Sequence, residues 1–416
     1  MPVGQVHPVP TARGGSLPTP AASVPSAVEG GPQAPPLVKF QAPEVVFGWG
    51  SLAEAGFAAR RLGALRAFVV TDPGIIEAGW VAEVEKYLRD AGVVPVVWSG
   101  VTPNPKDHEI EAGYAAYREA DCDVTVAIGG GSVIDAAKGV AILSGNGGAI
   151  LDYEGVDMVT AAIPPLVMIP STSGTGADVS QFCIVTDTAR LTKITIVGRT
   201  LVPDISVTDP RLLTTMPEWL NAATGLDALT HGVESFVSRA HNPLADGHAL
   251  NAVRLVSGSL ARTMTDPFDL EARGAMAQAS LEAGLAFSNA ILGATHAMSH
   301  QVGGLLDLPH GVVNGVLLPH VIRYNASSTP ERFVPLARAV GIPVDGLPAL
   351  DAAHLLADHV RALGDEVGVP RGLRELGVGE QDVERMTSTA LRDACMSTNP
   401  RDVDTTTVQT LFRAAL

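Results

Sequence analysis

The sequence predicts an α/β domain with a doubly wound parallel sheet, followed by an all-helical domain. Apolar strand-like runs alternate with helical patterns up to about residue 208, an order that is typical of parallel sheets. Long Ala- and Leu-rich segments with helical periodicity replace them afterwards. The 416 residues also exceed what one hydrophobic core usually spans. We therefore expect a dinucleotide-binding α/β domain over residues 37–208 and a helical domain over residues 209–416.

The first 36 residues differ in composition from the rest of the chain. They are rich in Pro, Ala, Gly and Ser, and Arg13 and Glu29 are their only Lys, Arg, Asp or Glu residues. Such a segment buries too little apolar surface to offset the entropic cost of ordering it. We expect residues 1–36 to be a disordered tail and assign it no role.

The α/β domain begins with a strand over residues 66–71, which a turn at Asp72-Pro73-Gly74 follows. A helix is predicted over 81–91, a strand over 93–98, a helix over 109–119 and a strand over 123–128. A further strand is predicted over 166–169. In the second domain the apolar periodicity predicts helices over 217–238, 242–264, 270–288 and 290–303.

The net charge of −16 and the pI near 5.0 exclude nucleic acid and anionic membrane as expected partners. No apolar run reaches the roughly 18 residues that a membrane span needs, and no secretory signal pattern is visible. The three cysteines, Cys122, Cys183 and Cys395, are far apart and form no CxxC motif, which suits a reducing compartment. We expect a cytoplasmic enzyme that acts on a small molecule.

Three glycines, Gly129, Gly130 and Gly131, separate the strand 123–128 from an Ala-rich helical segment. Glycine allows backbone N–H groups to approach an anion closely, and a helix N-terminus adds partial positive charge. Ser132 could cap this helix and also contact a phosphate. The spacing is not GxGxxG, so an ordinary tight turn explains the run equally well.

A second candidate loop, PSTSGTG over residues 170–176, follows the strand 166–169. Its hydroxyls and glycines suit an anion or a ribose, although a Ser/Thr-rich surface turn is an equal alternative. Two such loops at the carboxyl ends of neighbouring parallel strands favour a dinucleotide, because ligands bind at that edge. Asp72 ends the first strand, where a carboxylate could bind a ribose 2′-hydroxyl and favour NAD over NADP. This interpretation of Asp72 depends on the dinucleotide.

Histidine and aspartate recur at helical spacing in the second domain. Asp227 and His231 are four residues apart, as are His296 and His300, and residues four apart share a helix face. His310 follows in a turn-like segment. One Asp with three His residues suits Fe2+ or Zn2+, and does not suit Ca2+ or Mg2+. A single histidine is more often structural, but the clustering on apolar helices favours a metal site.

The chain resembles the iron-containing (group III) alcohol dehydrogenases in five segments: GGGSVIDAAK, PSTSGTGADVS, ATGLDALTHGVES, GLAFSNAILGATHAMSHQVGG and LPHGVVNGVLLPHVIRYN. The resemblance extends from about residue 37 to the C-terminus. The paired DALTH and HAMSH…PHG motifs, in order and at the family's spacing, are highly specific. The resemblance implies that the metal and the nicotinamide lie between a dinucleotide-binding domain and a helical domain.

The family's motifs imply roles for particular residues. Its metal ligands fall on Asp227, His231, His296 and His310. His300 matches a histidine near the nicotinamide that is associated with proton transfer or positioning. The family's cofactor contacts fall on Asp72, Asn104, Gly130, Gly131, Ser132, Asp135, Ser171, Thr172, Thr175, Ser180 and Lys193. Regions that face the substrate pocket in relatives contain Phe182, Phe287 and Cys395.

The implied activity is metal-dependent hydride transfer between NAD(H), in preference to NADP(H), and a primary alcohol or its aldehyde. Fe2+ is the implied ion, with Zn2+ as the alternative, and relatives are commonly homo-oligomers. Alternatives within the enzymes are a reductase of a phosphonate-, sulfonate- or hydroxyacid-type aldehyde, a glycerol dehydrogenase and a maleylacetate reductase. The last departs from the family at the metal motif, and motifs of the related dehydroquinate synthase are not evident. An inactive metal- or nucleotide-binding scaffold is the alternative from another class, which the intact ligand set disfavours.

Overall fold

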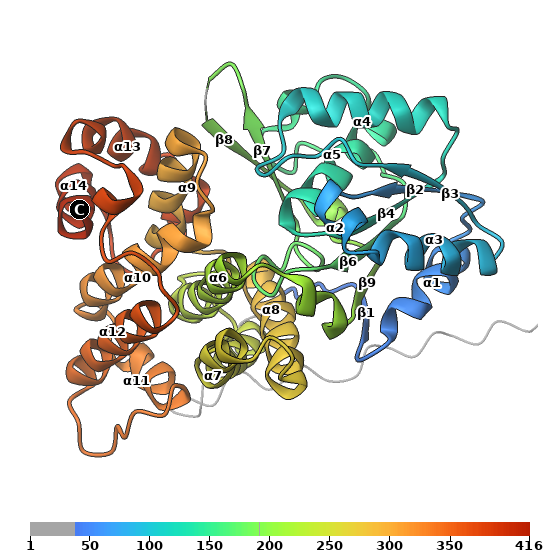
Figure 1. Cartoon of the computed structure of the whole chain (residues 1–416). Helices are drawn as coiled ribbons and strands as arrows, with labels where there is room; N and C mark the ends of the chain where they lie inside the picture. The colour runs from blue at the N-terminus through green and yellow to red at the C-terminus, as the bar shows by residue number, and fades with distance from the viewer. Residues whose placement is uncertain (1–37, 191) are drawn as a thin grey trace, which may run out of the picture. The chain divides into compact units, whose positions relative to one another are not determined.

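Six parallel strands form the central sheet of the first half of the chain, in the order β1-β9-β6-β4-β2-β3 (Figure 1). The structure, a computed structural model, describes residues 38–190 and 192–416. The predicted tail over residues 1–36 lies outside the described residues. The strands of this sheet are β1 (Glu44–Phe47), β2 (Arg66–Val70), β3 (Val94–Trp98), β4 (Val124–Gly129), β6 (Leu166–Pro170) and β9 (Ile205–Thr208).

Helices cover both faces of the sheet. On β2, Phe68 and Val70 belong to a core with α4 (Asp107–Glu119) and α5 (Gly131–Asn146). Ala67 and Val69 belong to a second core with α1 (Ala55–Arg61) and α3 (Trp80–Asp90). Because successive strand residues point to opposite faces, a strand that is buried on both sides must be apolar throughout. The doubly wound parallel sheet is therefore confirmed. The predicted strands correspond to β2, β3, β4 and β6, whereas β1 and β9 were not predicted.

The predicted turn after β2 is the start of a short helix, α2 (Pro73–Glu77). Asp72 is its N-cap, and its Oδ1 accepts a hydrogen bond from the backbone N–H of Ile75 at 3.1 Å. An aspartate before a proline at the first helical position is a strong helix start, so the DPG sequence fits a helix as well as a turn.

A smaller sheet of three strands, in the order β5-β8-β7, lies outside the sequence-based predictions. It consists of β5 (Gly155–Val156), β7 (Phe182–Asp187) and β8 (Thr192–Val197), and the last two are antiparallel. The pairing places Lys193 opposite Thr186. This hairpin therefore fixes the position of one residue that the family resemblance assigns to the cofactor.

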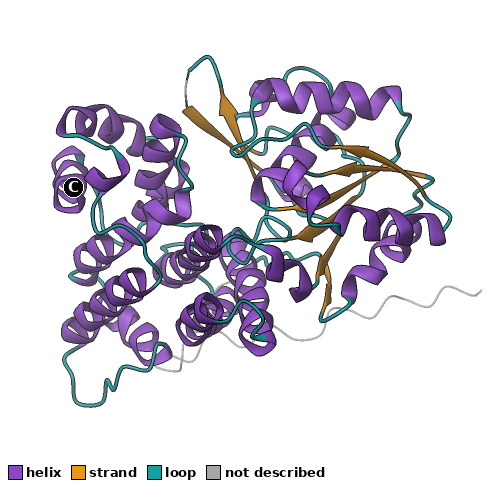
Figure 2. Ribbon diagram, viewed as in Figure 1, coloured by secondary structure: helices purple, strands orange, loops and turns teal. Residues whose placement is uncertain are grey.

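Beyond Thr208 the described chain contains helices and no strand (Figure 2). The four predicted helices correspond to α6 (Glu218–Val237), α7 (Pro243–Thr265), α8 (Leu270–Ala290) and α9 (Ala294–Leu306). The chain continues with α10 (His310–Ala326), α11 (Pro330–Ala339), α12 (Ala349–Glu366), α13 (Val383–Ala390) and α14 (Thr405–Ala415). Short 3-10 helices are η1 (Ser51–Glu54), η2 (Ile150–Tyr153), η3 (Arg199–Leu201), η4 (Pro210–Thr215), η5 (Leu373–Leu376), η6 (Glu380–Asp382) and η7 (Ala394–Thr398). The predicted fold class is confirmed, and the boundary at residue 208 stays a prediction because residues Lys39–Leu416 form one compact unit.

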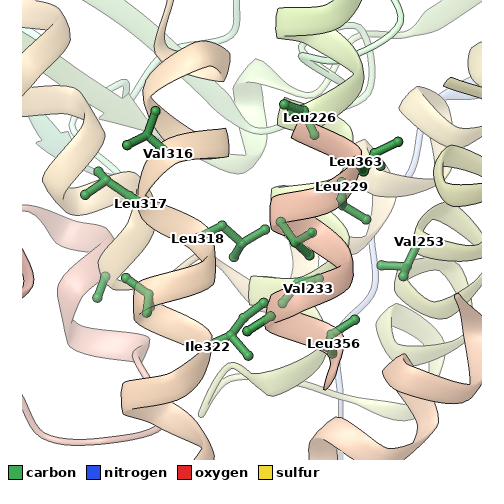
Figure 3. Close-up of a cluster of buried hydrophobic side chains, with 14 of the residues drawn as sticks. Leu226, Leu229, Val233, Val253, Val316, Leu317, Leu318, Ile322, Leu356 and Leu363 are labelled. Atoms are coloured by element: carbon green, nitrogen blue, oxygen red, sulfur yellow. The ribbon is translucent and has the colours of Figure 1, made fainter. Parts of the chain in front are cut away.

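The core of the helical half centres on α6 and α10 (Figure 3). Leu226, Leu229 and Val233 of α6 are buried against apolar residues of the neighbouring helices, among them Leu318 of α10 and Val253 of α7. The spacing of three and four residues on α6 gives this apolar face. This apolar face fixes α6 beside α10. The polar residues of α6 between the apolar positions are therefore buried as well.

In residues 38–190 and 192–416, no helix combines the length and the hydropathy that a membrane span requires. Cys122, Cys183 and Cys395 are buried and unpaired.

Candidate functional site

Side chains from three helices converge at one point of the helical half. Asp227 and His231 come from α6, His296 and His300 from α9, and His310 is the first residue of α10. The predicted common faces are confirmed, because Asp227 Oδ1 lies 3.8 Å from His231 Nε2 on the same helix. The segment at His310 is a helix start rather than a turn. We call the following four residues the donor cluster: Asp227, His231, His296 and His310.

The distances within the donor cluster fit one divalent cation. His296 Nε2 lies 3.5 Å from Asp227 Oδ1, and His310 Nε2 lies 3.2 Å from Asp227 Oδ2. Ligand atoms that bind one ion tetrahedrally at about 2.1 Å are about 3.4 Å apart. Three imidazoles and one carboxylate are also the donor set that Fe2+ or Zn2+ prefers. Asp227, His231 and His296 are buried, whereas the His310 side chain is 29% exposed and leaves one side of the cluster accessible.

Neighbouring acceptors orient two of the imidazoles. His231 Nδ1 donates to the carbonyl oxygen of Gly174 at 3.1 Å, and His296 Nδ1 donates to Glu234 Oε2 at 2.7 Å. Each bond places a proton on Nδ1 and directs Nε2 toward Asp227. Glu234 is buried and also accepts from the backbone N–H of Thr295 at 2.6 Å, which ties it to the start of α9.

Burial and charge set the protonation of the cluster. Burial lowers the pKa of His231 to about 3, so this imidazole is neutral. Burial opposes charge on His296 too, but its hydrogen bonds with Asp227 and Glu234 outweigh that effect and raise its pKa to about 9. Burial also opposes charge on Asp227, yet the nearby histidines hold the pKa of this carboxyl well below its usual range. A bound cation would take the place of the proton on His296.

His300 lies beside the donor cluster, with its ring centroid 6.0 Å from that of His296 and 6.4 Å from that of His310. Its Nδ1 donates to Asp393 Oδ2 at 2.9 Å. Burial disfavours the charged Asp393, but the charge of His300 and this bond lower the pKa of the Asp393 carboxyl. The bond leaves His300 Nε2 free to exchange a proton.

The three predicted pocket residues lie together next to the donor cluster. Phe182, Phe287 and Cys395 belong to one buried apolar cluster, which also contains Leu292. The Phe287 ring stacks on His231 with a centroid distance of 4.5 Å and lies 5.6 Å from the Phe182 ring. The side of the donor cluster at His231 is therefore apolar.

The two predicted loops are neighbours in the sheet, since Gly129 of β4 pairs with Pro170 of β6. They approach so closely that a Cβ on Gly131 would lie 2.8 Å from Thr175 Cγ2, inside the contact distance of real side chains. The prediction that Ser132 caps α5 is wrong. Gly130 is the N-cap and α5 has no side-chain cap bond there, while Ser132 Oγ accepts from the Asn104 backbone N–H at 3.1 Å.

Asn104 joins further residues from both halves of the chain. Its Oδ1 accepts from Lys193 Nζ at 2.7 Å, and its Nδ2 donates to Asp307 Oδ1 at 2.5 Å. Burial lowers the pKa of Lys193 to about 8. Ser132, Asn104 and Lys193 are thus connected by hydrogen bonds, and Asp307, which follows α9, extends the connection into the helical half.

The remaining predicted cofactor residues follow the carboxyl ends of β2, β4 and β6. Asp72 lies after β2, and the backbone N–H of Ser171 donates to the carbonyl oxygen of Gly129 at 2.9 Å. Thr172 is within reach of Gly130, where a Cβ would lie 3.2 Å from its Cγ2. The two other candidates, Ser180 and Asp135, interact with the buried Lys138.

Ser180 is buried, and its carbonyl oxygen accepts from the buried Lys138 Nζ at 2.8 Å. Burial raises the pKa of Asp135 on α5 to about 7, against the effect of the nearby Lys138 charge. Both residues thus interact with the buried Lys138, an interaction that was not predicted from the sequence.

Three residues of the site escaped the sequence interpretation: Glu234, Asn314 and Asp393. Glu234 follows His231 by three residues, and Asn314 follows His310 by four, so helical spacing could have identified both. Asn314 Nδ2 lies 2.8 Å from Asp227 Oδ1. Asp393 is 93 residues from His300 and carries no such signal.

Comparison with known proteins gives matches over nearly all of the described chain. A family model described as iron-containing alcohol dehydrogenase matches residues 42–210. A second model, the C-terminal part of the Fe-containing alcohol dehydrogenase family, matches residues 221–416.

Individual relatives also match the chain over most of its length. The chain is 42% identical to a 1,3-propanediol dehydrogenase of Citrobacter freundii over 371 residues, which is 89% of this chain and 96% of the relative. It is 36% identical to an NAD-dependent methanol dehydrogenase of Bacillus methanolicus over 377 residues, 91% of this chain and 99% of the relative. The crystal structure of a 1,3-propanediol oxidoreductase superposes with a TM-score of 0.89 at 40% identity, covering 92% of this chain and 100% of that chain.

A sulfoacetaldehyde reductase from Bifidobacterium kashiwanohense, solved in complex with NAD+, superposes with a TM-score of 0.80 at 28% identity. This match covers 91% of the chain and 98% of that structure. Similarity on this scale includes both loops and all three helices that carry the donor cluster.

Proposed function

Because the chain belongs to the iron-containing alcohol dehydrogenase family, we propose that it transfers a hydride between NAD(H) and a primary alcohol or its aldehyde, with Fe2+ at the donor cluster. The observation that carries this proposal is the convergence of one carboxylate and three imidazoles beside a loop that follows a parallel strand. The carbonyl oxygen of Gly174, in that loop, accepts directly from His231 of the cluster. Zn2+ fits the same donors and is the alternative ion.

The residues of the site have different roles in the reaction. The bound groups supply Lewis acidity from the cation and hydride acceptance from the nicotinamide. The donor cluster fixes the place where charge develops on the substrate oxygen, and Phe287 excludes water from its apolar side. His300, held by Asp393, takes up or delivers the hydroxyl proton through its free Nε2.

The cofactor residues supported by geometry are those that gather at the ends of the parallel strands. We propose that Gly130, Gly131 and the loop 171–176 bind the pyrophosphate, since both loops meet at the N-terminus of α5. Asn104 and Lys193 are hydrogen-bonded partners that can donate to the cofactor between the two halves. We also propose that the protein is a homo-oligomer located in the cytoplasm. The unpaired cysteines suit a reducing compartment.

The direct test uses protein loaded anaerobically with Fe2+ and a panel of primary alcohols and aldehydes, with NADH absorbance as the readout. We expect turnover with at least one member of the panel and a metal content near one ion per chain. Metal-loaded protein that binds NADH but turns over no member of the panel would instead support the inactive scaffold.

Asp72 provides a test of cofactor selectivity. In Asp72→Gly we expect the kcat/KM ratio of NADP to NAD to rise by roughly tenfold or more, because a repulsion of about 1–4 kcal/mol with the 2′-phosphate is removed. The N-cap of α2 costs only a few tenths of a kcal/mol when glycine replaces the aspartate. Asp72→Asn tests the charge alone, because asparagine keeps the helix cap and removes only the charge. No gain with NADP in either variant would show that Asp72 acts only as the helix cap.

Lys193 predicts a pH dependence of cofactor binding. Burial places its pKa at about 8, so the ammonium is present below that pH and is lost above it. We expect the Kd of NADH, measured by fluorescence titration, to increase as the pH rises through about 8. Lys193→Met should bind NADH more weakly with no inflection at this pH, and Lys193→Arg should remove the inflection while retaining charge. An inflection that persists in Lys193→Met would assign it to another group.

A further inference from the structure

Asn314 is a fully buried amide in direct contact with the donor cluster. It lies on α10, one turn after His310, and none of its surface is exposed. Its Nδ2 is 2.8 Å from Asp227 Oδ1 and 3.1 Å from His296 Nε2. A carboxylate oxygen only accepts hydrogen bonds, so the amide N–H must face Asp227. Each of the three helices therefore places two residues, four apart, at this point.

The other end of the Asn314 amide has no partner in the described part of the chain. Its Oδ1 is buried and accepts no hydrogen bond from the described residues. Buried polar groups in proteins are almost always paired, so an unpaired one requires an explanation. An apolar residue of the same shape would avoid this unpaired oxygen and fill the space equally well. The amide is therefore explained by what its N–H does for Asp227.

We propose that Asn314 is a positioning residue of the donor cluster, which fixes the Asp227 carboxylate in the orientation that receives the cation. The N–H holds Oδ1, while Oδ2 stays on the side of His310, 3.2 Å from its Nε2. The final torsion of an aspartate side chain is otherwise broad, so an unrestrained carboxylate would lose order on binding an ion. Within residues 38–190 and 192–416, Asn314 is the side chain outside the donor cluster whose N–H donates to Asp227.

This inference rests on the proposed function, because it assumes that the donor cluster binds a metal. Groups that orient metal ligands typically change metal affinity by 10- to 100-fold when they are replaced. The test variant is Asn314→Leu, because leucine has nearly the same shape and no donor. The matched control is Asn325→Leu on the same helix, a buried asparagine that bonds Asn399 and does not contact the cluster.

The experiment measures the Kd of Zn2+ for the metal-free full-length proteins, by competition with a chelator of known affinity. We expect Asn314→Leu to bind Zn2+ about 10- to 100-fold more weakly than the wild type, and Asn325→Leu to bind it within about threefold of the wild type. Circular dichroism and thermal unfolding of each metal-free protein check the fold. If Asn314→Leu does not fold, Asn314→Ala is measured in the same way, with the same expected loss.

His310→Ala separates the two levels of the argument. If His310→Ala loses Zn2+ affinity while the Asn314 variant stays within about threefold of the wild type, the positioning role is wrong and the metal site stands. If His310→Ala also keeps the wild-type affinity, the donor cluster itself is not the metal site. An equal loss in Asn314→Leu and Asn325→Leu would show a general effect of α10 packing and would also overturn the positioning role.

Discussion

Replacing His296 with alanine should remove the bound metal and lower kcat/KM by about 10³-fold or more, because Lewis-acid stabilisation contributes several kcal/mol. His296 is buried, and its two ring nitrogens face the carboxylates of Asp227 and Glu234. Its loss removes a donor and leaves these two carboxylates without a shared partner. Metal content by mass spectrometry and initial rates by NADH absorbance measure the two effects.

His320→Ala is the matched control for this prediction, because His320 lies on α10, the helix that begins with His310. We expect this variant to keep its metal and most of its activity. His310→Ala should behave like His296→Ala, with a smaller effect on stability because its side chain is 29% exposed. Near-wild-type activity and metal content in both His296→Ala and His310→Ala would end the metal assignment.

Adding one methyl group at Gly311 should disable the site without changing any ligand. A Cβ at this position would lie 2.2 Å from the carbonyl oxygen of Ala223 and 3.1 Å from Asp227 Cβ. A backbone carbonyl in α6 cannot rotate away as a side chain can, so α10 must shift and carry His310 with it. We expect Gly311→Ala to lose about 1–3 kcal/mol of unfolding free energy. A displacement near 1 Å should lower kcat/KM by roughly 10²-fold.

Denaturant unfolding, kcat/KM and metal affinity of Gly311→Ala are compared with those of Gly364→Ala. Gly364 is in α12, and among the described residues outside its own helical turn and chain neighbours no atom lies within 4 Å of the Cβ that would be added there. Alanine at that helical position should stabilise the protein by about 0.5–1 kcal/mol and leave activity unchanged. If both variants behave alike, the contact between α10 and α6 does not control the geometry of the cluster.

The metal site was predictable because its signal is local, although the choice of the four ligands came from the family resemblance. Asp227 and His231 share a helix face through a spacing that the sequence displays, and the same holds for His296 and His300. The buried strands of the sheet were also recognisable as short apolar runs. In both cases the chain neighbourhood alone determines the pattern.

Other features depend on contacts between distant segments. Asp393 is 93 residues from His300 along the chain, and the packing of η7 against α9 brings them together. Ser132 has the residue type of a helix cap, but it accepts from the Asn104 backbone instead. The hairpin of β7 and β8 was missed because the apolar run at the start of β7 is only four residues long and β8 contains three apolar residues among polar ones.

The four proposed ligands all come from α6, α9 and α10, and the loop at Gly174 contributes a carbonyl oxygen behind His231. The coenzyme could therefore dissociate after a turnover, and a new one bind, without breaking any bond between the protein and the ion. The ion would then remain bound over many turnovers. The nucleotide, whose proposed contacts come mainly from the strand-end loops, would bind and dissociate in each turnover.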